Sequence, residues 1–384
     1  MSLFAPANDE FWYWVCTPVV IAFSALLFIG MWSTKNHFEV EGRTVVITGG
    51  SQGMGRGVAH RLANKGANIV LVARDVEKLE AAINYLEGSV EQAKKENFHQ
   101  PNSKNQRFHY ISADVSKPEE NERVIKEVTE WNNGTPPDIV WANAGSSRPT
   151  LFLDSSVEQL HAQMDINYWA AVYLAQAAMK SWLAPLLKDA SSSAAPATAK
   201  LAKDEKGKLL PRHFVITSSV VSIVGLAGYS PYSPPKAALK NLSDCLRSEL
   251  NLYSGAIAKN GDTIPEVKVN TVIPGTILTP GLENENKTKH PVTLMLENDD
   301  PHQTEDEVAA AAISSLESGE YLIATQWLGK AIRVSGLGGS PRNGWGIVDA
   351  LFGWVANLVW LFVGPDMERK VYKWGKTNGV YKKD

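Results

Sequence analysis

The stretch RTVVITGGSQGMG, residues 43–55, decides the fold of this chain. Its first half is a short β-branched run, which is typical of a buried strand. Its second half contains Gly49, Gly53 and Gly55, and glycines let a backbone turn sharply and approach a ligand closely. A helix expected after this turn would offer free N–H groups and a partial positive charge to a pyrophosphate. The stretch therefore predicts a dinucleotide site in a strand–turn–helix unit.

The same alternation of strand and helix continues along most of the chain. Strands are expected at residues 43–50, 68–74, 107–115, 137–145, 213–220, 267–275 and 320–324, with helices between them, the longest at 156–188. Such alternation favours a parallel sheet with helices on both faces, joined by right-handed crossovers. We predict an α/β fold with a Rossmann-type doubly wound parallel sheet, which forms a single catalytic domain over residues 39–335. Residues 189–207, rich in Ala, Ser and Lys, are expected to form a disordered surface insertion.

The N-terminal part carries an uncharged run from Phe11 to Thr34. At about 1.5 Å per residue this run extends roughly 36 Å, enough to cross a hydrocarbon core of about 30 Å. A signal peptide is the competing interpretation, but it would begin with positive charge, and no Lys or Arg precedes Lys35. We therefore predict an N-terminal transmembrane helix, with residues 1–38 as the membrane anchor. Because Lys35 and Arg43 follow the run, the positive-inside rule places the main body in the cytosol.

A second apolar segment, residues 350–365, lies within the C-terminal part that we separate as residues 336–384. It has no charge, but it is short for a membrane span. A helix that lies on the membrane or dips into it is our first choice. A buried helix is the second choice, and a full span is the third.

The composition limits the partners and the compartment. The net charge of the 384-residue chain is −3, which offers no basic surface to nucleic acid. The two cysteines, Cys16 and Cys245, give no disulfide framework, so the folded part is expected in a reducing compartment. We predict no metal site, and we leave a homo-oligomer open.

The residue at the end of the second expected strand, Arg74, indicates which of two candidate cofactors the chain binds. The adenosine ribose of a dinucleotide lies at this strand end, where an acid favours NAD and an arginine pairs with the 2′-phosphate of NADP. Arg74 stands at the strand end, Asp75 follows it, and Lys78 lies one helical turn further on. We therefore predict NADPH.

The segment SPYSPPKAALKNL, residues 230–242, has the features of a helix start. Prolines are tolerated in the first turn of a helix, and residues four apart, such as Tyr232 and Lys236, share one face. A nearby ammonium favours a phenolate, so we expect Lys236 to lower the pKa of Tyr232. Tyr232 would then donate the proton that reduction of a carbonyl group requires.

Taken together, these motifs resemble those of the short-chain dehydrogenase/reductase family. The matching stretches, within about residues 42–330, are TGGSQGMG at 48–55, ADV at 113–115, NAG at 143–145, Asn167, SS at 218–219, YSPPK at 232–236 and PG at 274–275. The resemblance implies the catalytic set Ser219, Tyr232, Lys236 and Asn167. In this set Ser219 would bind the substrate carbonyl, and Asn167 would hold a water that links Lys236 to solvent. Ser218 stays open as the alternative serine.

The resemblance also implies a cofactor site. In this family the residue matching Asp114 holds the adenine amino group, residues 143–145 pack beneath the cofactor, and the backbone after Pro274 and Gly275 touches the nicotinamide carboxamide. The expected cofactor-binding residues are Gly49, Ser51, Gln52, Gly53, Met54, Gly55, Arg74, Lys78, Asp114, Val115, Asn143, Ala144, Gly145, Tyr232, Lys236, Pro274, Gly275 and Ile277.

Within the family, the expected anchor, the LVARD stretch with Lys78, YSPPKAAL and the apolar C-terminal segment resemble 3-ketodihydrosphingosine reductases, particularly fungal ones. That resemblance implies NADPH-dependent reduction of a long-chain keto-sphingoid base at the cytosolic face of the endoplasmic reticulum membrane, a step of sphingolipid biosynthesis. Residues 281–303 are expected to form a lid, in which Glu283 and Glu285 are candidates to meet the substrate's amino group. Two alternatives remain: a membrane-bound reductase of a steroid or retinoid, and an inactive NADP-binding membrane scaffold.

Overall fold

The computed structural model describes residues 36–96, 106–183, 202–204, 206–260, 264–344 and 346–380. The expected transmembrane run, residues 11–34, and most of the expected insertion, residues 189–207, lie outside these ranges. The described end of the insertion forms a turn, because Lys203 and Leu209 are bridged and Asp204 accepts the backbone N–H of Lys206 at 3.0 Å. The expectation that residues 189–207 form a disordered insertion stays a prediction.

Seven parallel strands form one sheet in the order β3-β2-β1-β4-β5-β6-β9. The strands are β1 (Thr44–Thr48), β2 (Asn68–Ala73), β3 (Phe108–Ser112), β4 (Ile139–Ala142), β5 (Arg212–Thr217), β6 (Val267–Ile273) and β9 (Leu322–Ala324). Because β1 pairs with both β2 and β4, the strand order reverses there, as in dinucleotide-binding folds. The predicted doubly wound parallel sheet is confirmed.

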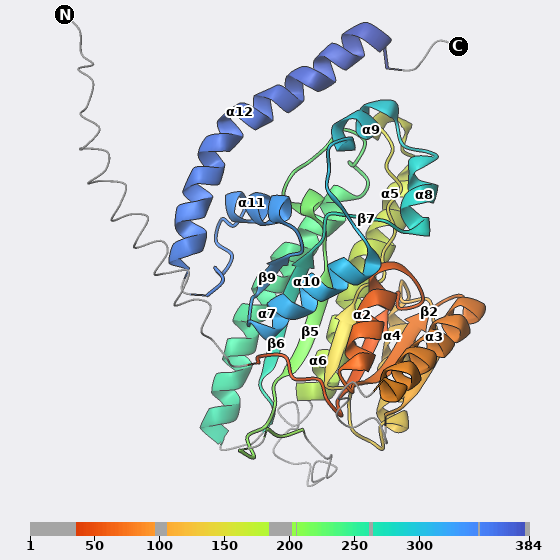
Figure 1. Cartoon of the computed structure of the whole chain (residues 1–384). Coiled ribbons are helices and arrows are strands. Elements are labelled where there is room, and N and C mark those ends of the chain that lie inside the picture. The colour runs from red at the N-terminus through yellow and green to blue at the C-terminus, as the bar shows by residue number, and fades with distance from the viewer. Residues whose placement is uncertain are drawn as a thin grey trace, which may run out of the picture.

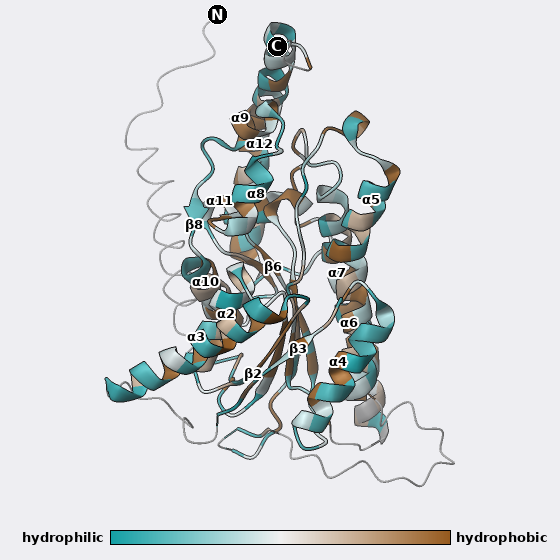
Figure 2. Ribbon diagram, turned by 90° about the vertical axis from the view of Figure 1, so that its right-hand side faces the viewer, coloured by the Kyte–Doolittle hydropathy of each residue, from teal (hydrophilic) through white to brown (hydrophobic). Residues whose placement is uncertain are grey.

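Helices cover both faces of this sheet (Figure 2). One face carries α2 (Gly53–Asn64), α3 (Val76–Lys95) and α10 (Glu305–Glu317), and the other carries α4 (Pro118–Trp131), α6 (Ala170–Leu183) and α7 (Ser233–Asn260). Successive strand residues point to opposite faces, so Ile47 packs in one core and Val46 in the other. The strands therefore have two buried faces, and their exposed ends alone are available for a site.

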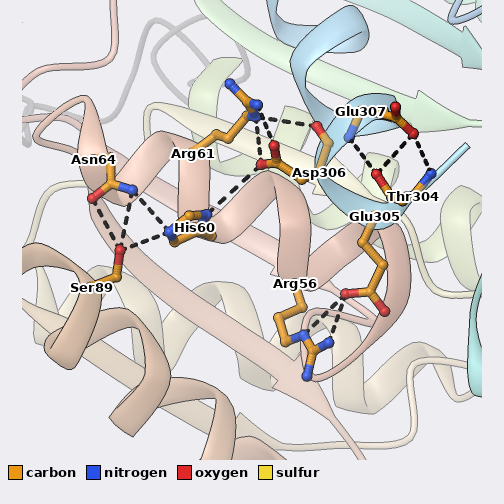
Figure 3. A network of polar contacts seen from close by, with 9 residues as sticks. All are labelled: Arg56, His60, Arg61, Asn64, Ser89, Thr304, Glu305, Asp306 and Glu307. Carbon is orange, nitrogen blue, oxygen red and sulfur yellow. Dashed lines mark hydrogen bonds and ion pairs between the residues drawn. The ribbon is translucent and has the colours of Figure 1, made fainter.

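Helix α10 packs against α2, the helix that follows the glycine-rich turn, and polar side chains of the two helices contact each other (Figure 3). A Cβ on Gly57 would lie 2.4 Å from the carbonyl oxygen of Glu305, so only glycine permits this close approach. The carboxylate of Glu305 accepts the backbone N–H of Gly53 at 2.9 Å and lies 2.9 Å from the guanidinium of Arg56. Glu305 thus caps the start of α2 from a distant part of the chain.

The long helix expected at residues 156–188 is interrupted. Its described part divides into α5 (Val157–Met164), the π-helix η2 (Asp165–Trp169) and α6. Single π-turns inside α-helices occur frequently at functional sites, and this one contains Asn167. The expectation of one continuous α-helix was wrong here, because apolar spacing does not reveal a local change in hydrogen bonding.

The chain ends in two helices, α11 (Trp327–Ser335) and α12 (Ile347–Asn378). Helix α12 has 32 residues, or about 48 Å at 1.5 Å per residue, and is longer than the apolar segment 350–365. Figure 1 shows it passing along the outside of the molecule, beside α11 and towards α9 (Pro291–Glu297). In the described part of the chain, α12 is one helix whose length and composition would allow it to span a membrane. Because Trp354, Leu361 and Phe362 are 67–78% exposed, the buried-helix alternative is wrong.

Candidate active site

The carboxyl ends of the strands open into a cleft of about 1560 Å³. This is the edge of a doubly wound sheet at which ligands bind. The expected residues that line the cleft are Gly49, Ser51, Gln52, Gly53, Met54, Arg74, Lys78, Asp114, Val115, Asn143, Ala144, Gly145, Ser219, Tyr232, Lys236, Pro274, Gly275 and Ile277. Tertiary structure thus brings most of the expected site together from the ends of six strands.

The glycine-rich turn has the shape that a closely approaching ligand needs. Gly49 and Gly53 have φ values of +64° and +61°, which favour glycine. A Cβ on Gly55 would lie 2.2 Å from the carbonyl oxygen of Gly49. Gly55, expected as a cofactor contact, does not line the cleft but lets α2 pack beneath the turn.

The ribose end of the cleft presents cations. Arg74 and Lys78 are exposed there. The carboxylate of Asp75 accepts the backbone N–H of Lys78 at 3.1 Å as the N-cap of α3, and it lies 3.1 Å from the Lys78 ammonium. Because Asp75 and Lys78 pair with each other, the positive charge left to meet a ligand at this end is that of Arg74.

Asp114 lies at the expected adenine end of the cleft. Burial raises the pKa of Asp114, but hydrogen bonds from Ser116 outweigh it and leave the pKa below its usual value. Its carboxylate accepts from the backbone N–H and the hydroxyl of Ser116, at 3.1 and 2.8 Å. Asp114 therefore stays an anionic acceptor, suited to an exocyclic amino group.

Tyr232 directly precedes α7, and Lys236 lies in its first turn with the two prolines. Lys236 is 2% exposed, its ammonium donates to the Thr217 carbonyl at 3.0 Å, and it lies 5.6 Å from the centroid of the Tyr232 ring. Burial lowers the pKa of Lys236 to about 8. Burial and the charge of Glu285 raise the pKa of Tyr232, while a hydrogen bond with Ser219 lowers it. The expected lowering of the Tyr232 pKa by Lys236 is thus wrong here, because desolvation of the phenolate dominates.

The structure separates the two candidate serines. The hydroxyl of Ser218 is buried and donates to the carbonyl of Lys236 at 2.8 Å, so it supports α7. Ser219 begins the 3-10 helix η4 (Val220–Ser222), faces the cleft and hydrogen-bonds Tyr232. The geometry therefore favours Ser219 over Ser218 as the serine that meets a substrate.

Asn167 lies behind the cleft rather than on its wall. It is 1% exposed, and its amide nitrogen donates to the carbonyls of Ser146 and Gln163, at 2.8 and 3.1 Å. A Cβ on Gly145 would lie 2.8 Å from the Asn167 oxygen and 3.2 Å from the Lys236 nitrogen. Asn167 and Lys236 therefore meet at the same glycine, and the water expected between them stays a prediction.

A buried ion network that sequence reasoning missed lies beside Tyr232. The expected lid contains α8 (Pro280–Asn286) and α9 (Pro291–Glu297). Between them, the buried Lys289 ammonium lies 2.9 Å from Glu285 and 2.6 Å from Glu297. The hydroxyl of Tyr229 lies within hydrogen-bonding distance of both carboxylates, and the ring centroids of Tyr229 and Tyr232 are 6.0 Å apart. The Glu285–Lys289 spacing of four residues is the one sequence signal that could have indicated this pair.

The two lid acids named as candidates for an amino group behave differently. Glu283 is exposed and does not line the cleft, whereas Glu285 does. A second contact holds the lid at this point, because the hydroxyl of Thr293 donates to the Ala227 carbonyl at 2.9 Å. Gly228 lies beneath it with φ +91°, and a Cβ there would come within 2.1 Å of that hydroxyl. The lid is therefore packed against the segment that carries Tyr232.

Fold and site together define a nucleotide-dependent oxidoreductase, and a family model agrees. The model for short chain dehydrogenases matches residues 43–290, so the chain belongs to the short-chain dehydrogenase family. The chain is 46% identical over 348 residues to the 3-ketodihydrosphingosine reductase ksrA of Aspergillus fumigatus, covering 90% of this chain and 88% of that protein. It is 39% identical to the 3-ketodihydrosphingosine reductase gsl-3 of Neurospora crassa, covering 96% and 92%.

Solved structures share the fold at low identity. A short chain dehydrogenase from Burkholderia phymatum in complex with NAD has a TM-score of 0.57 at 17% identity, covering 78% of this chain and 94% of that one. An alcohol dehydrogenase from Thermococcus sibiricus complexed with 5-hydroxy-NADP has a TM-score of 0.51 at 22% identity, covering 73% and 94%. The shared part is the doubly wound domain.

Proposed function

We propose that this chain reduces a long-chain keto-sphingoid base, 3-ketodihydrosphingosine, to dihydrosphingosine with NADPH. The observation that carries the proposal is the assembly of Ser219, Tyr232 and Lys236 in one cleft at the carboxyl edge of the sheet. The names of the fungal relatives support the substrate, because the chain matches nearly their whole length.

The catalytic residues divide the work of carbonyl reduction. Ser219 donates a hydrogen bond to the ketone oxygen and orients it beside Tyr232. The raised pKa of Tyr232 keeps the phenol protonated at neutral pH. Because an alkoxide is a stronger base than a phenolate, the proton moves from Tyr232 to the new hydroxyl group. Lys236, held by the Thr217 carbonyl, sits beneath the tyrosine ring and faces the cleft.

The residues present fit a dinucleotide. The turn from Gly49 to Met54 would hold its pyrophosphate, Asp114 its adenine, and Lys236 its nicotinamide ribose. Arg74 and Lys78 would hold a 2′-phosphate, and the engagement of the Asp75 carboxylate by the backbone N–H of Lys78 supports NADPH over NADH. When bound, NADPH supplies the hydride that this chemistry requires.

We further infer a membrane location at the endoplasmic reticulum with the catalytic domain in the cytosol. Two features support it: the uncharged run at residues 11–34 and the exposed apolar surface of α12. The chain then divides into an anchor at residues 1–38, a catalytic domain at 39–335 and a membrane-associated part at 336–384.

Substrate profiling tests the proposal. The purified full-length protein, in a neutral detergent, is assayed for NADPH oxidation with keto-sphingoid bases, ketosteroids and retinal, and Tyr232→Phe serves as the blank. We expect kcat/KM to be highest for the keto-sphingoid bases. A higher value for a ketosteroid or retinal would favour the alternative reductase. No turnover of any member, with NADPH still bound, would favour the scaffold.

A further inference from the structure

Helix α12 is fastened to the catalytic domain at both ends. At its start, the carboxylate of Asp349 accepts both guanidinium N–H groups of Arg333 on α11, at 2.7 and 2.5 Å. At its far end, the ring of Trp374 packs edge-on against His290 with centroids 5.1 Å apart, and His290 donates to the Val380 carbonyl at 2.7 Å. Because His290 caps α9, the helix bridges from α11 to the lid.

The face of α12 between these fastenings is turned inwards. The half-buried positions from Ala356 onward are Ala356, Trp360, Gly364, Met367, Val371, Trp374 and Gly375. The first six are spaced by three or four residues and form one stripe along the helix, and Gly375 adjoins its end. The helix therefore has a defined inner face, although apolar residues also cover its outside.

The inner face forms a wall of the catalytic cleft. Trp360, Val363 and Met367 of α12 line the same cavity as Tyr232 and Ser219. Facing them are Leu328 and Ile332 of α11 together with Met295 and Leu296 of α9. The cleft thus joins the polar reacting residues to apolar side chains of α9, α11 and α12, and α12 also places Lys370 on the cleft lining.

The outer face of the same turns provides a matched reference surface. Leu361 and Phe362 are 67% and 78% exposed, and neither lines the cleft. Substitutions at neighbouring positions on α12 can therefore distinguish an effect inside the cleft from an effect on contact with lipid. Helix α12 also lies beyond residue 290, where the family match ends, so it can carry a property particular to this chain.

We propose that the inner face of α12, through Trp360 and Met367 and with Val363 at its edge, is the subsite for the saturated alkyl chain of the substrate and sets its length preference. The inference rests on the proposed reduction of a keto-sphingoid base. Each methylene buried in such a subsite strengthens binding by roughly fourfold, from about 0.8 kcal/mol per methylene. A flexible alkyl chain can follow the wall between α12, α11 and α9 while its ketone lies at Tyr232.

A chain-length profile tests the subsite. The full-length protein, Trp360→Ala and Leu361→Ala are compared in one neutral detergent, with keto-sphingoid bases that share a head group and differ in saturated chain length. Partitioning into detergent affects all three proteins equally, so the ratio of variant to unmutated kcat/KM at each length is the quantity to compare. We expect a ratio near one for short chains in Trp360→Ala, falling roughly 16-fold once about two methylenes lose contact.

The control and a second variant make the result decisive. Leu361→Ala, on the outer face, should keep a ratio near one at every length. The NADPH dissociation constant and the melting temperature show whether each variant is folded. If Trp360→Ala does not fold, Met367→Ala is measured in its place, with the same fall expected at longer chains.

The outcomes separate the subsite from the reaction itself. A loss by the same factor at all lengths would show that the inner face is only structural and overturn the inference. An equal length dependence in Leu361→Ala would also overturn it, because the effect would not belong to one face. No turnover by the unmutated protein at any length would instead overturn the proposed function, and the inference with it.

Discussion

The two ends of the parallel sheet bury charge in different ways. At the amino end, Arg43 is 2% exposed and donates to the carbonyls of Glu39 and Pro211, at 2.7 and 2.6 Å. At the carboxyl end, Lys236 is also 2% exposed, but it lies beside the large cleft. A charge enclosed by protein oxygens stabilises the fold, whereas a charge on a cavity wall can act on a ligand. The contrast predicts where substitutions change activity and where they change stability.

The largest effect is expected for Tyr232→Phe at the carboxyl end. Loss of the proton donor should lower the single-turnover rate of reduction by about 10²–10⁴-fold. The NADPH dissociation constant should stay nearly unchanged, since the ring is kept. Tyr229→Phe is the matched control, because its hydroxyl bonds the lid acids and should affect stability more than rate. A Tyr232→Phe protein that keeps more than a tenth of the rate would contradict the assignment.

The expected lid provides a charge that lines the cleft but is held by two carboxylates, and Lys289→Met tests whether it stabilises the fold as the charge at the amino end does. Removing the ammonium leaves Glu285 and Glu297 buried without their cation, which should cost about 3–5 kcal/mol of stability. Chemical denaturation measures this loss. Lys287→Met, on the same lid but exposed, should change stability by less than about 0.5 kcal/mol. If Lys289→Met and Lys287→Met lose the same stability, the buried position of Lys289 contributes nothing beyond that of an exposed lysine.

Arg74→Ala tests the ligand-facing charge at the ribose end. A charge-assisted contact to a phosphate contributes about 1.5–3 kcal/mol, or roughly 10- to 150-fold in affinity. KM for NADPH should therefore rise by that factor, while KM for NADH changes little. Arg123→Ala, on α4 with partners Glu120 and Glu127, is the control and should leave both values unchanged. Equal NADH and NADPH kinetics in the unmutated protein would contradict the predicted preference.

The last comparison concerns pH and the amino end. Burial lowers the pKa of His213 to about 3, so the folded state excludes a proton that the unfolded state binds below about pH 6.5. The stability contributed by neutral His213 is full above pH 6.5 and falls as the pH drops towards 3, by at most about 1.4 kcal/mol per unit.

His213→Gln removes this titration and keeps a donor for Asn270, which lies 3.1 Å from His213. Denaturation curves between pH 4 and 7 should therefore show a shallower loss of stability in His213→Gln than in the unmutated protein. The exposed His161 offers a control, since His161→Gln should leave the slope as it is. If the pH dependence of stability is the same in His213→Gln as in the unmutated protein, His213 is not kept neutral by burial in the folded state.

The chain's local patterns were sufficient for the fold class, the glycine-rich turn and the Tyr232–Lys236 pair. Each depends on residues that are near neighbours in sequence: β-branched runs, glycines at fixed spacing, and two residues one helical turn apart. The alternation of strands and helices along the chain was enough to predict a parallel sheet, because parallel strands require crossover connections, which are usually helices. These features follow from local geometry, so no tertiary contact was needed to predict them.

Tertiary structure alone decided the features that depend on distant contacts. Ser219 rather than Ser218 hydrogen-bonds Tyr232, because the buried hydroxyl of Ser218 donates to the carbonyl of Lys236. The raised pKa of Tyr232 and the Tyr229–Glu285 contact, across 56 residues, arise from burial that no local spacing encodes. Residues 350–365 of α12 carry no charge in sequence, and only the fastening of the helix to Arg333 and His290 turns one face into the cleft. Local patterns specify elements, whereas desolvation and the pairing of remote groups require the folded chain.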